Sequence, residues 1–182
     1  VYGRLGLREL EDQVRGAQHV AQRAYVDGDR IGIWGWSYGG FQTAQIIGQQ
    51  SNTWACGVSV APVATFDLYD SFYTERFMGL NTENDNKINY SHTNAFENLS
   101  KNRNEGYLPR FTLIHGTADD NVHFQNAAKL SKKLIQEGFQ FDGYFYADEQ
   151  HSINSDSVTR RHVYRLISRK LNECLKDQFD LV

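Results

Sequence analysis

The chain has 182 residues, a length that suits one domain. Hydrophobic residues make up 40% of it and charged residues 23%, which is the ordinary range for globular domains. The formal net charge is −3 and the basic residues form no stripe, so a nucleic-acid-binding role is not expected. The sequence contains no run of about 18 apolar residues and no signal-like start, so no membrane-spanning segment is predicted within it.

The first elements in chain order alternate between helix and strand. One apolar stripe, with intervals of four and three residues, predicts a helix from about Leu7 to Tyr25 that packs on a sheet. The stripe consists of Leu10, Val14, Ala17, Ala21 and Ala24. The elements predicted next are a strand from Ile31 to Trp34, a helix from Gly40 to Ile47 and a strand from Ala55 to Val60. Pro62 and the aromatic stretch up to Leu80 are predicted to form a loop or short helices.

The second half continues the same alternation. The asparagine-rich segment from Asn81 to Gly106 is predicted to be the least ordered part, with helical turns. The elements after it are a strand from Phe111 to Ile114, a helix from Val122 to Glu137, a strand from Phe141 to Tyr146 and a final helix from about Asp156 to Leu175. The buried face predicted for the final helix is Val163, Leu166, Ile167, Leu171 and Cys174. This order favours a parallel sheet with helical crossovers.

A Gly-x-Ser-x-Gly motif, Gly35 to Gly39, follows an apolar strand directly and runs into helix-forming sequence. This context is typical of a nucleophile elbow, in which a serine stands at a strained turn between strand and helix. A glycine two positions to either side would let strand and helix pass without collision. We therefore predict Ser37 as a nucleophile and the N–H of Tyr38 as an oxyanion donor. An ordinary glycine-rich turn is the alternative.

A serine nucleophile needs a histidine to accept its proton, and that histidine needs a carboxylate partner. With this kind of elbow the partners follow in the order Ser, Asp, His. Asp119 lies in the loop after the strand that ends at Ile114, and His151 lies in the loop after the strand that ends at Tyr146. The sequence therefore predicts Asp119 as the acid and His151 as the general base.

Other assignments stay open at this point. Asp119 or Asp120 could instead cap the helix that begins near Val122. The remaining histidines either fall in or beside regular elements, which favours packing or surface roles, or have no chemical context. They are His19, His92, His115, His123 and His162.

Five stretches resemble the catalytic domain of the prolyl oligopeptidase family, in the branch that contains dipeptidyl peptidase IV and fibroblast activation protein. They are Gly35 to Gly40, Ala61 to Val63, Tyr69 to Ser71, Tyr73 to Leu80 and His115 to Phe124. The similarity runs along nearly the whole chain. It implies an α/β protein, with a partial α/β-hydrolase fold whose mostly parallel sheet is flanked by helices.

The resemblance implies a serine aminopeptidase that releases dipeptides with proline or alanine second, without cofactor or metal. Ser37, Asp119 and His151 match the family's nucleophile, acid and base. Tyr38 matches the residue whose N–H serves the oxyanion hole and whose ring lines the proline pocket. The other residues that match the substrate site are Val63, Phe66, Tyr69, Tyr73, Asn121 and Val122. Phe66 stands where the family usually has tryptophan, and the flat aromatic walls suit a small apolar proline ring.

The chain also departs from the family pattern. Ser152 and Gln150 flank the predicted base where relatives usually have glycine and often aspartate. An elbow at residue 37 implies that residues 1–182 are the peptidase domain without its first strands and without the family's β-propeller. A second oxyanion donor, a tyrosine, and the paired glutamates that grip the substrate's amino terminus would then lie upstream. The isolated fragment is expected to have weak or no activity.

Cys56 and Cys174 are the only cysteines, and by themselves they could be buried thiols or one bridge. The resemblance implies a disulfide between them. Asn89 and Asn98 begin glycosylation sequons, which indicates a secreted or cell-surface parent. The resemblance further implies a homodimer formed through the terminal helix, whose apolar stripe is equally expected to pack on the sheet.

Two other functional classes remain beside a peptidase acting on peptide substrates. A serine esterase of the same fold would share the predicted triad but not the stretches Tyr73 to Leu80 and His115 to Phe124. A noncatalytic binding homologue would tolerate loss of Ser37, which this chain retains.

Overall fold

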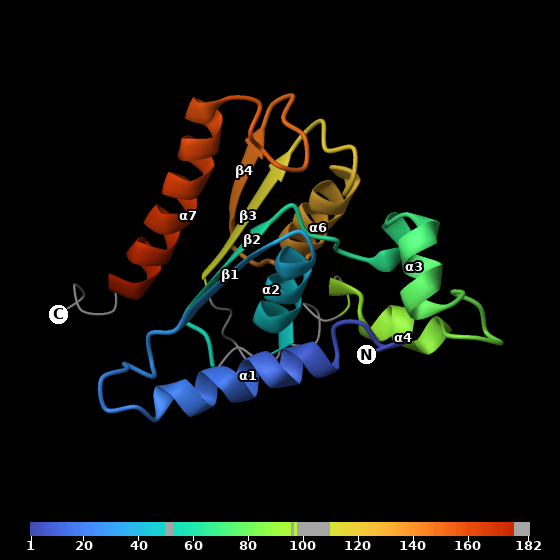
Figure 1. Cartoon of the computed structure of the whole chain (residues 1–182), viewed down its shortest axis with the longest axis horizontal. Helices are drawn as coiled ribbons and strands as arrows, with labels where there is room; N and C mark the ends of the chain where they lie inside the picture. Colours follow the sequence, from blue (N-terminus) through green and yellow to red (C-terminus); the bar gives the residue numbers. More distant parts are fainter. Residues whose placement is uncertain (50–52, 96, 98–109, 177–182) are drawn as a thin grey trace.

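A parallel sheet forms the centre of the molecule, seen in a computed structural model that describes residues 1–49, 53–95, 97 and 110–176. Its four strands lie in the order β1-β2-β3-β4, and each adjacent pair is parallel (Figure 1). The strands are β1 (Gly32–Trp36), β2 (Cys56–Val60), β3 (Arg110–Gly116) and β4 (Asp142–Tyr146). The predicted parallel α/β arrangement is therefore confirmed.

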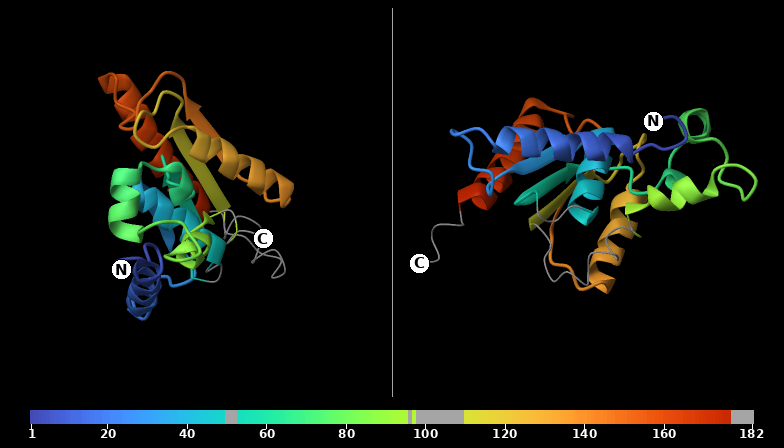
Figure 2. Two further views of the ribbon diagram at one scale, coloured as in Figure 1. Left: turned by 90° about the vertical axis from the view of Figure 1, so that its right-hand side faces the viewer. Right: turned by 90° about the horizontal axis from the view of Figure 1, so that it is seen from below.

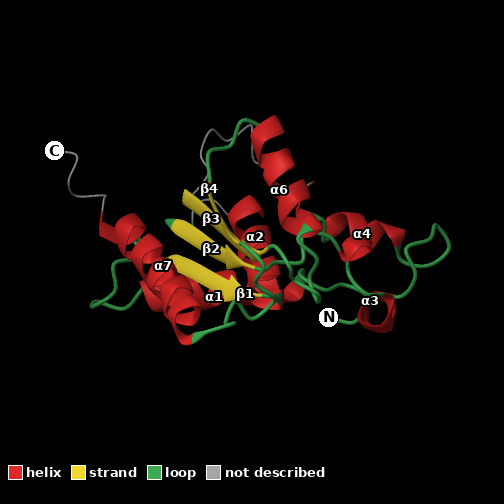
Figure 3. Cartoon of the chain, turned by 90° about the horizontal axis from the view of Figure 1, so that it is seen from above, coloured by secondary structure: helices red, strands yellow, loops and turns green. Residues whose placement is uncertain are grey.

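Helices cover both faces of this sheet. The helices with bounds in the described part of the chain are α1 (Arg8–Ala21), α2 (Tyr38–Gln49), the short 3-10 helix η1 (Phe66–Leu68), α3 (Ser71–Met78), α4 (Lys87–His92), α6 (Gln125–Gln136) and α7 (Ser157–Lys176). Viewed from above, α2 and α6 lie on one side of the strands and α7 lies on the other (Figure 3). Helices α3 and α4 form a lobe beside α2 (Figure 1).

The alternation of side chains along β3 explains why both faces are covered. Leu113 belongs to the core cluster that includes residues of α2 and α6, whereas its neighbour Ile114 belongs to the cluster that includes residues of α7. Both side chains are fully buried. Because successive side chains of a strand point to opposite faces, an apolar run such as this one needs a layer on each side.

The first helix is shorter than its apolar stripe predicted. It ends at Ala21 rather than Tyr25, and only Leu10 and Val14 of the stripe are buried. Helix α1 packs on α2, and it lies nearest the viewer when the molecule is seen from below (Figure 2). Ala17 is the last residue of the stripe that packs against the core cluster, and Ala24 is exposed, so the last predicted turn has no apolar surface to cover.

The final helix uses its apolar stripe to pack on the sheet. Val163, Leu166 and Ile167 are buried in the cluster that contains Val58 and Val60 of β2. The stripe therefore serves the sheet, which was one of the two uses that the sequence left open.

A disulfide bond joins the amino end of β2 to the last turns of α7. It links Cys56 to Cys174, whose Cα atoms are 6.2 Å apart. Beside it Lys170 lies 2.7 Å from a carboxylate oxygen of Asp142 on β4 and 3.1 Å from one of Glu173. The structure thus contains the disulfide that the resemblance implied.

Residues 96 and 98–106 of the polar segment from 81 to 106 lie outside the described residues. Its described part contains α4, in agreement with the helical turns expected there. Within the part of the chain that the structure describes, no helix has both the length and the apolar character needed to cross a membrane.

Candidate functional site

Ser37 lies in the turn between β1 and α2, where its backbone has a positive φ of 58°. Its N–H donates to the carbonyl of Val60 at 2.9 Å, and its own carbonyl accepts from the N–H of Phe41 at 2.9 Å. A non-glycine residue in this region of φ is uncommon and costs about 1–3 kcal/mol where the surroundings impose it. The strained turn at the amino end of a helix is the geometry that the elbow motif predicts.

Two glycines permit this turn, but they are not the pair expected from the motif. A Cβ added at Gly35 would lie 2.2 Å from the carbonyl oxygen of Gly39, and one at Gly40 would lie 2.5 Å from that of Val60. A Cβ added at Gly39 would meet no atom within 4 Å. The expectation that Gly39 prevents a collision is therefore wrong, because it is Gly40 that faces the carboxyl end of β2.

Asp119 lies in the loop after β3, and its side chain is fully buried. Its Oδ1 accepts hydrogen bonds from the N–H groups of Asn121 and Val122, at 3.0 and 2.9 Å. Its Oδ2 accepts from Nδ1 of His151 at 2.8 Å. The carboxylate therefore closes the turn before α6 and also binds His151. It does not cap α6, whose N-cap is Phe124 with no side-chain hydrogen bond, so the capping role considered for Asp119 is wrong. Asp120 is exposed.

Opposing effects set the charge of Asp119. Burial raises the pKa of its carboxyl group, but hydrogen bonds from His115 and His151, the positive charge available on His151 and the N–H of Asn121 lower it more. The net result is a pKa well below the ordinary value for aspartate. The group is thus held as a carboxylate, the form that accepts a hydrogen bond from an imidazole.

The loop that carries His151 is fixed to the elbow and to the sheet. The indole N–H of Trp36, the residue before Ser37, donates to the carbonyl of His151 at 2.9 Å. Farther along the loop, Ile153 is fully buried and Glu149 accepts a hydrogen bond from the N–H of Ser155. The structure therefore gathers Ser37, Asp119 and His151 at the carboxyl edge of the sheet, although they are far apart in the sequence.

His115 contacts the same carboxylate, which the sequence did not reveal. Its ring is fully buried, and Nε2 lies 2.8 Å from the carbonyl oxygen of Val122 and 3.2 Å from Oδ2 of Asp119. The ring packs edge-on against Phe124 at 5.8 Å between centroids. Its place as the last buried polar residue of a strand, four positions before Asp119, was the available signal.

The residues predicted to line a proline pocket share one apolar cluster next to Ser37. Its buried members are Leu5, Phe41, Val63, Phe66, Met78, Tyr90 and Val122, and its partly buried members are Tyr38, Tyr69, Tyr73 and Phe77. Tyr69 and Tyr73 pack edge to face, with ring centroids 5.5 Å apart. The hydroxyl of Tyr69 donates to Oδ1 of Asn121 at 2.8 Å, so the aromatic lobe is tied to the loop of Asp119.

Tyr38 is anchored by a residue that the sequence did not single out. Its hydroxyl donates to Oε1 of Glu9 on α1 at 2.6 Å, and its ring packs on Phe41 at 5.3 Å. Burial and the hydrogen bond to the Glu9 carboxylate raise the pKa of the Tyr38 hydroxyl far above its ordinary value. The tyrosine therefore stays neutral, with its ring against the apolar cluster.

The two predicted glycosylation sites, Asn89 and Asn98, fall on either side of the boundary of the described residues. Asn89 lies within α4, where its side-chain amide donates to Oδ1 of Asn86. Asn98 lies outside the described residues.

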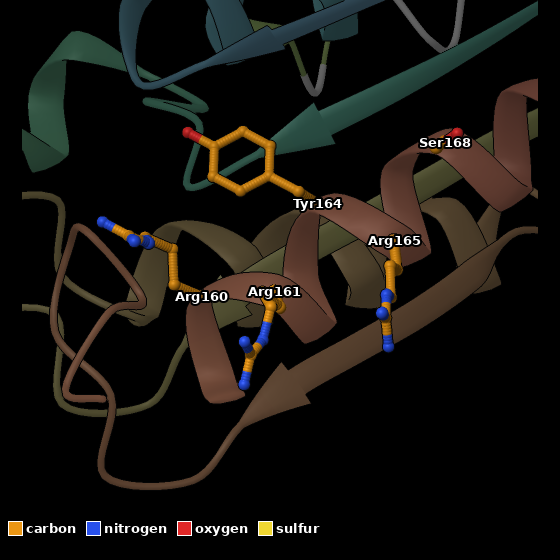
Figure 4. A pocket seen from close by; sticks show the side chains of 5 residues that line it. All are labelled: Arg160, Arg161, Tyr164, Arg165 and Ser168. Atoms are coloured by element: carbon orange, nitrogen blue, oxygen red, sulfur yellow. The ribbon is translucent and has the colours of Figure 1, made fainter. Parts of the chain in front are cut away.

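A shallow cavity of about 300 Å³ lies elsewhere, along α7. Arg160, Arg161, Tyr164, Arg165 and Ser168 line it (Figure 4). None of the predicted site residues is among them. In the described ranges, no group of three or more His, Cys, Asp or Glu side chains is arranged to hold a metal ion.

Several known proteins are similar in sequence to nearly the whole of this chain. The chain is 44% identical over 171 residues to dipeptidyl peptidase 4 of Bos taurus, 39% identical over 174 residues to prolyl endopeptidase FAP of Homo sapiens, and 40% identical over 177 residues to venom dipeptidyl peptidase 4 of Apis mellifera. These matches cover 94%, 96% and 96% of the chain but 22% of each relative.

The fold is also that of a solved relative. The crystal structure of Porphyromonas gingivalis dipeptidyl peptidase 4 matches with a TM-score of 0.87 and 39% sequence identity, over 94% of this chain and 23% of that one. The parallel sheet with helices on both faces is therefore part of an α/β-hydrolase fold. The sequence model of the prolyl oligopeptidase family matches residues 1–178, and the chain belongs to that family.

Proposed function

We propose that this chain is the catalytic part of a serine dipeptidyl aminopeptidase. The enzyme would release amino-terminal dipeptides whose second residue is proline or alanine. One observation carries the proposal: the buried carboxylate of Asp119 binds Nδ1 of His151 at 2.8 Å, in a loop that Trp36 ties to the strained turn of Ser37. These contacts support the proposed arrangement, in which Asp119 is the acid, His151 the base and Ser37 the nucleophile of a serine hydrolase.

In the proposed mechanism Nδ1 of His151 keeps its proton, which it donates in a hydrogen bond to Asp119. The other ring nitrogen, Nε2, is then free of a proton and can act as the base. His151 takes the proton of the Ser37 hydroxyl while the oxygen attacks the substrate carbonyl, and the N–H of Tyr38 donates to the resulting oxyanion. The imidazolium then gives its proton to the leaving amine, and the dipeptide stays on Ser37 as an ester. Water, deprotonated by His151, hydrolyses this ester and restores the hydroxyl.

The apolar cluster supports the preference for proline or alanine. Tyr38, Tyr69 and Tyr73 are partly buried members of this cluster, and Val63, Phe66 and Val122 are buried in it. In the proposal these side chains line the substrate pocket. A pocket of this kind accepts a compact apolar side chain and has no polar partner for a larger charged one. In the proposed complex Asn121 helps to hold the substrate carbonyl.

The chain spans only 22% of the length of the curated relatives it matches, so the complete enzyme is itself a proposal. The proposed protein supplies upstream the remaining strands of the sheet, a β-propeller, a tyrosine that completes the oxyanion hole and the glutamates that bind the substrate's amino terminus. Loss of one oxyanion donor costs about 2.7–4 kcal/mol, so the present chain alone should be weakly active or inactive.

The same proposal includes an extracellular setting and a homodimer. The disulfide between Cys56 and Cys174 supports an oxidising compartment, and one relative is a venom protein. Glycosylation at Asn89 and Asn98 would agree with this setting, and peptide mass analysis of secreted protein tests it. Dimerisation through the terminal helix is tested by sedimentation of the full-length protein.

The catalytic proposal is tested with the full-length protein, a Gly-Pro chromogenic substrate and a simple ester substrate. We expect dipeptide release, and we expect Ser37→Ala to abolish it. Ester cleavage without dipeptide release would instead indicate an esterase, and inactivity toward both substrates a binding homologue. The thermal unfolding of Ser37→Ala serves as the control that its fold is intact.

A further inference from the structure

We propose that His115 is a positioning residue, which orients the Asp119 carboxylate toward His151 and ties it to the wall of the substrate pocket. The inference rests on the proposed function, because it concerns the same acid and base. It assigns a role to a histidine that would otherwise count as core packing.

The two neighbours of Nε2 determine which tautomer of His115 is present. The carbonyl oxygen of Val122, at 2.8 Å, and the carboxylate oxygen of Asp119, at 3.2 Å, can both only accept hydrogen bonds. Nε2 must therefore carry a proton and share it between the two acceptors. One N–H thus reaches both the acid of the proposed triad and the backbone of the segment that lines the pocket.

The contact from His115 completes the surroundings of the carboxylate. Oδ1 of Asp119 receives two backbone N–H groups, and Oδ2 receives Nδ1 of His151 and the shared N–H of His115. With two donors on each oxygen the carboxylate cannot rotate without breaking a hydrogen bond. The oxygen that binds His151 is therefore held in place from the side of the sheet.

The other ring nitrogen argues that packing alone does not explain this histidine. In the described part of the chain Nδ1 of His115 is buried without a hydrogen-bond partner. A buried polar atom without a partner is costly and rare, so a ring needed only to fill space against Phe124 would be better supplied by an apolar residue. The cost is understandable if the N–H on the opposite side of the ring has a function.

The test uses two substitutions of similar length, one with an amide group and one without a hydrogen-bond donor. His115→Gln can present an amide N–H near the position of Nε2, whereas His115→Met fills similar space without any donor. His162→Phe is the matched control, because His162 pairs with the hydroxyl of Tyr146 on the surface and not with Asp119. The reaction of Ser37 with a fluorophosphonate reports the nucleophile without requiring peptide specificity, and dipeptide release reports the full reaction.

For His115→Met we expect the labelling rate of Ser37 and kcat to fall about 10- to 100-fold with little change in KM, the size expected for a lost hydrogen bond to a charged group. His115→Gln should recover most of this loss, and His162→Phe should match the wild type. The titratable groups facing Asp119 are His115 on β3, His151 beyond β4 and Tyr69 after η1. Without His115, Oδ2 of Asp119 accepts a hydrogen bond from His151 alone. The acidic limb of the kcat/KM profile, where the base His151 becomes protonated, should therefore move to higher pH.

A measurement on the wild type keeps the proposal falsifiable if His115→Met does not fold. In protein labelled with ¹⁵N-histidine, the His115 ring should carry its proton on Nε2, and a proton found only on Nδ1 overturns the proposal. Equal rates and equal pH profiles for the Met variant and the wild type also overturn it, and so does a Gln variant that is as slow as the Met variant. If the wild type labels at Ser37 but releases no dipeptide, the peptidase function fails while the His115 proposal stands on the labelling rates. A wild type that does not label refutes both.

Discussion

The two edges of the sheet are held together by different means. At the carboxyl edge the loops after β1, β3 and β4 meet through hydrogen bonds, among them those from Trp36 to His151 and from His151 to Asp119. At the amino edge the disulfide between Cys56 and Cys174 joins β2 to α7. The carboxyl edge also contains the strained φ of Ser37, whereas the bonds of the amino edge involve none of the proposed catalytic groups.

This difference separates chemistry from stability. The polar contacts at the carboxyl edge hold groups that the proposed reaction uses, so changes there should affect activity more than folding. The covalent link at the amino edge restrains the chain far from those groups, so its loss should affect folding more than activity. Each prediction below tests one side of this contrast.

The largest effect is expected at Asp119. Asp119→Asn leaves the shape of the side chain but removes the charge that fixes the tautomer of His151, so kcat should fall by about 10⁴-fold. The exposed neighbour Asp120 offers a matched control, because Asp120→Asn makes the same chemical change. The rate of dipeptide release, measured for both variants of the full-length protein, tests this prediction. Equal rates for the two variants would show that Asp119 is not the acid of the triad.

The next largest effect is expected at the amino edge. Replacing both Cys56 and Cys174 with alanine opens a link between residues 118 positions apart, which should lower the free energy of unfolding by about 4–5 kcal/mol. Denaturant unfolding measures this change. The rate at which the folded variant reacts with a fluorophosphonate at Ser37 should stay the same. A slower reaction would show that the two edges are coupled.

The glycines of the elbow give a sharper comparison within the carboxyl edge. Gly40→Ala brings a Cβ to 2.5 Å from the Val60 carbonyl oxygen, which belongs to rigid backbone, so it should destabilise the protein by about 1–3 kcal/mol. Gly39→Ala meets nothing and removes a glycine from a helix, so it should stabilise by up to about 1 kcal/mol. Thermal unfolding of the two variants tests the order, and the reverse order would contradict the geometry of the turn.

Acid should weaken the carboxyl edge through Asp119. Because its folded pKa is lower than its unfolded value of about 3.9, the carboxylate adds stability that is complete above that value. This contribution is lost as pH falls from there through the lower folded pKa. The difference in unfolding free energy between wild type and Asp119→Asn should therefore shrink as pH is lowered below about 4. A difference that stays constant over this range would mean that the carboxylate gains nothing on folding.

Local sequence was enough to predict the strands and the strand-turn-helix geometry at Ser37, and to place Asp119 and His151 in loops after two of the strands. Each of these features depends on residues close to one another in the chain, and parallel strands then bring the three loops to one edge. The early end of α1 was not predictable from its stripe, because whether Ala24 meets a neighbour depends on where the helix crosses α2.

The missed contacts share a physical cause. The hydrogen bond between Glu9 and Tyr38 joins two elements 29 residues apart, and no periodicity in either element indicates it. The difference between Gly39 and Gly40 depends on which side of α2 passes the end of β2, a rotation that the motif does not encode. Such pairings appear only once the packing of the elements is known.

The smallest effect is expected from the ion pairs beside the disulfide. The hydrogen bond to Asp142 raises the pKa of Lys170, against the opposing effect of its burial, and the ammonium lies 5.5 Å from the centre of the Tyr144 ring. Asp142 and Glu173 remain partly exposed, so water screens the pairs, and Lys170→Met should lower the free energy of unfolding by less than about 1 kcal/mol. Lys133→Met, which breaks the similar pair between Lys133 of α6 and Glu137 at its C-cap, is the matched control. If Lys170→Met costs several kcal/mol more than the control in denaturant unfolding, the charges share the restraint at the amino edge. An equal cost for the two variants would indicate that the disulfide and the apolar contacts of α7, and not these charges, restrain the amino edge.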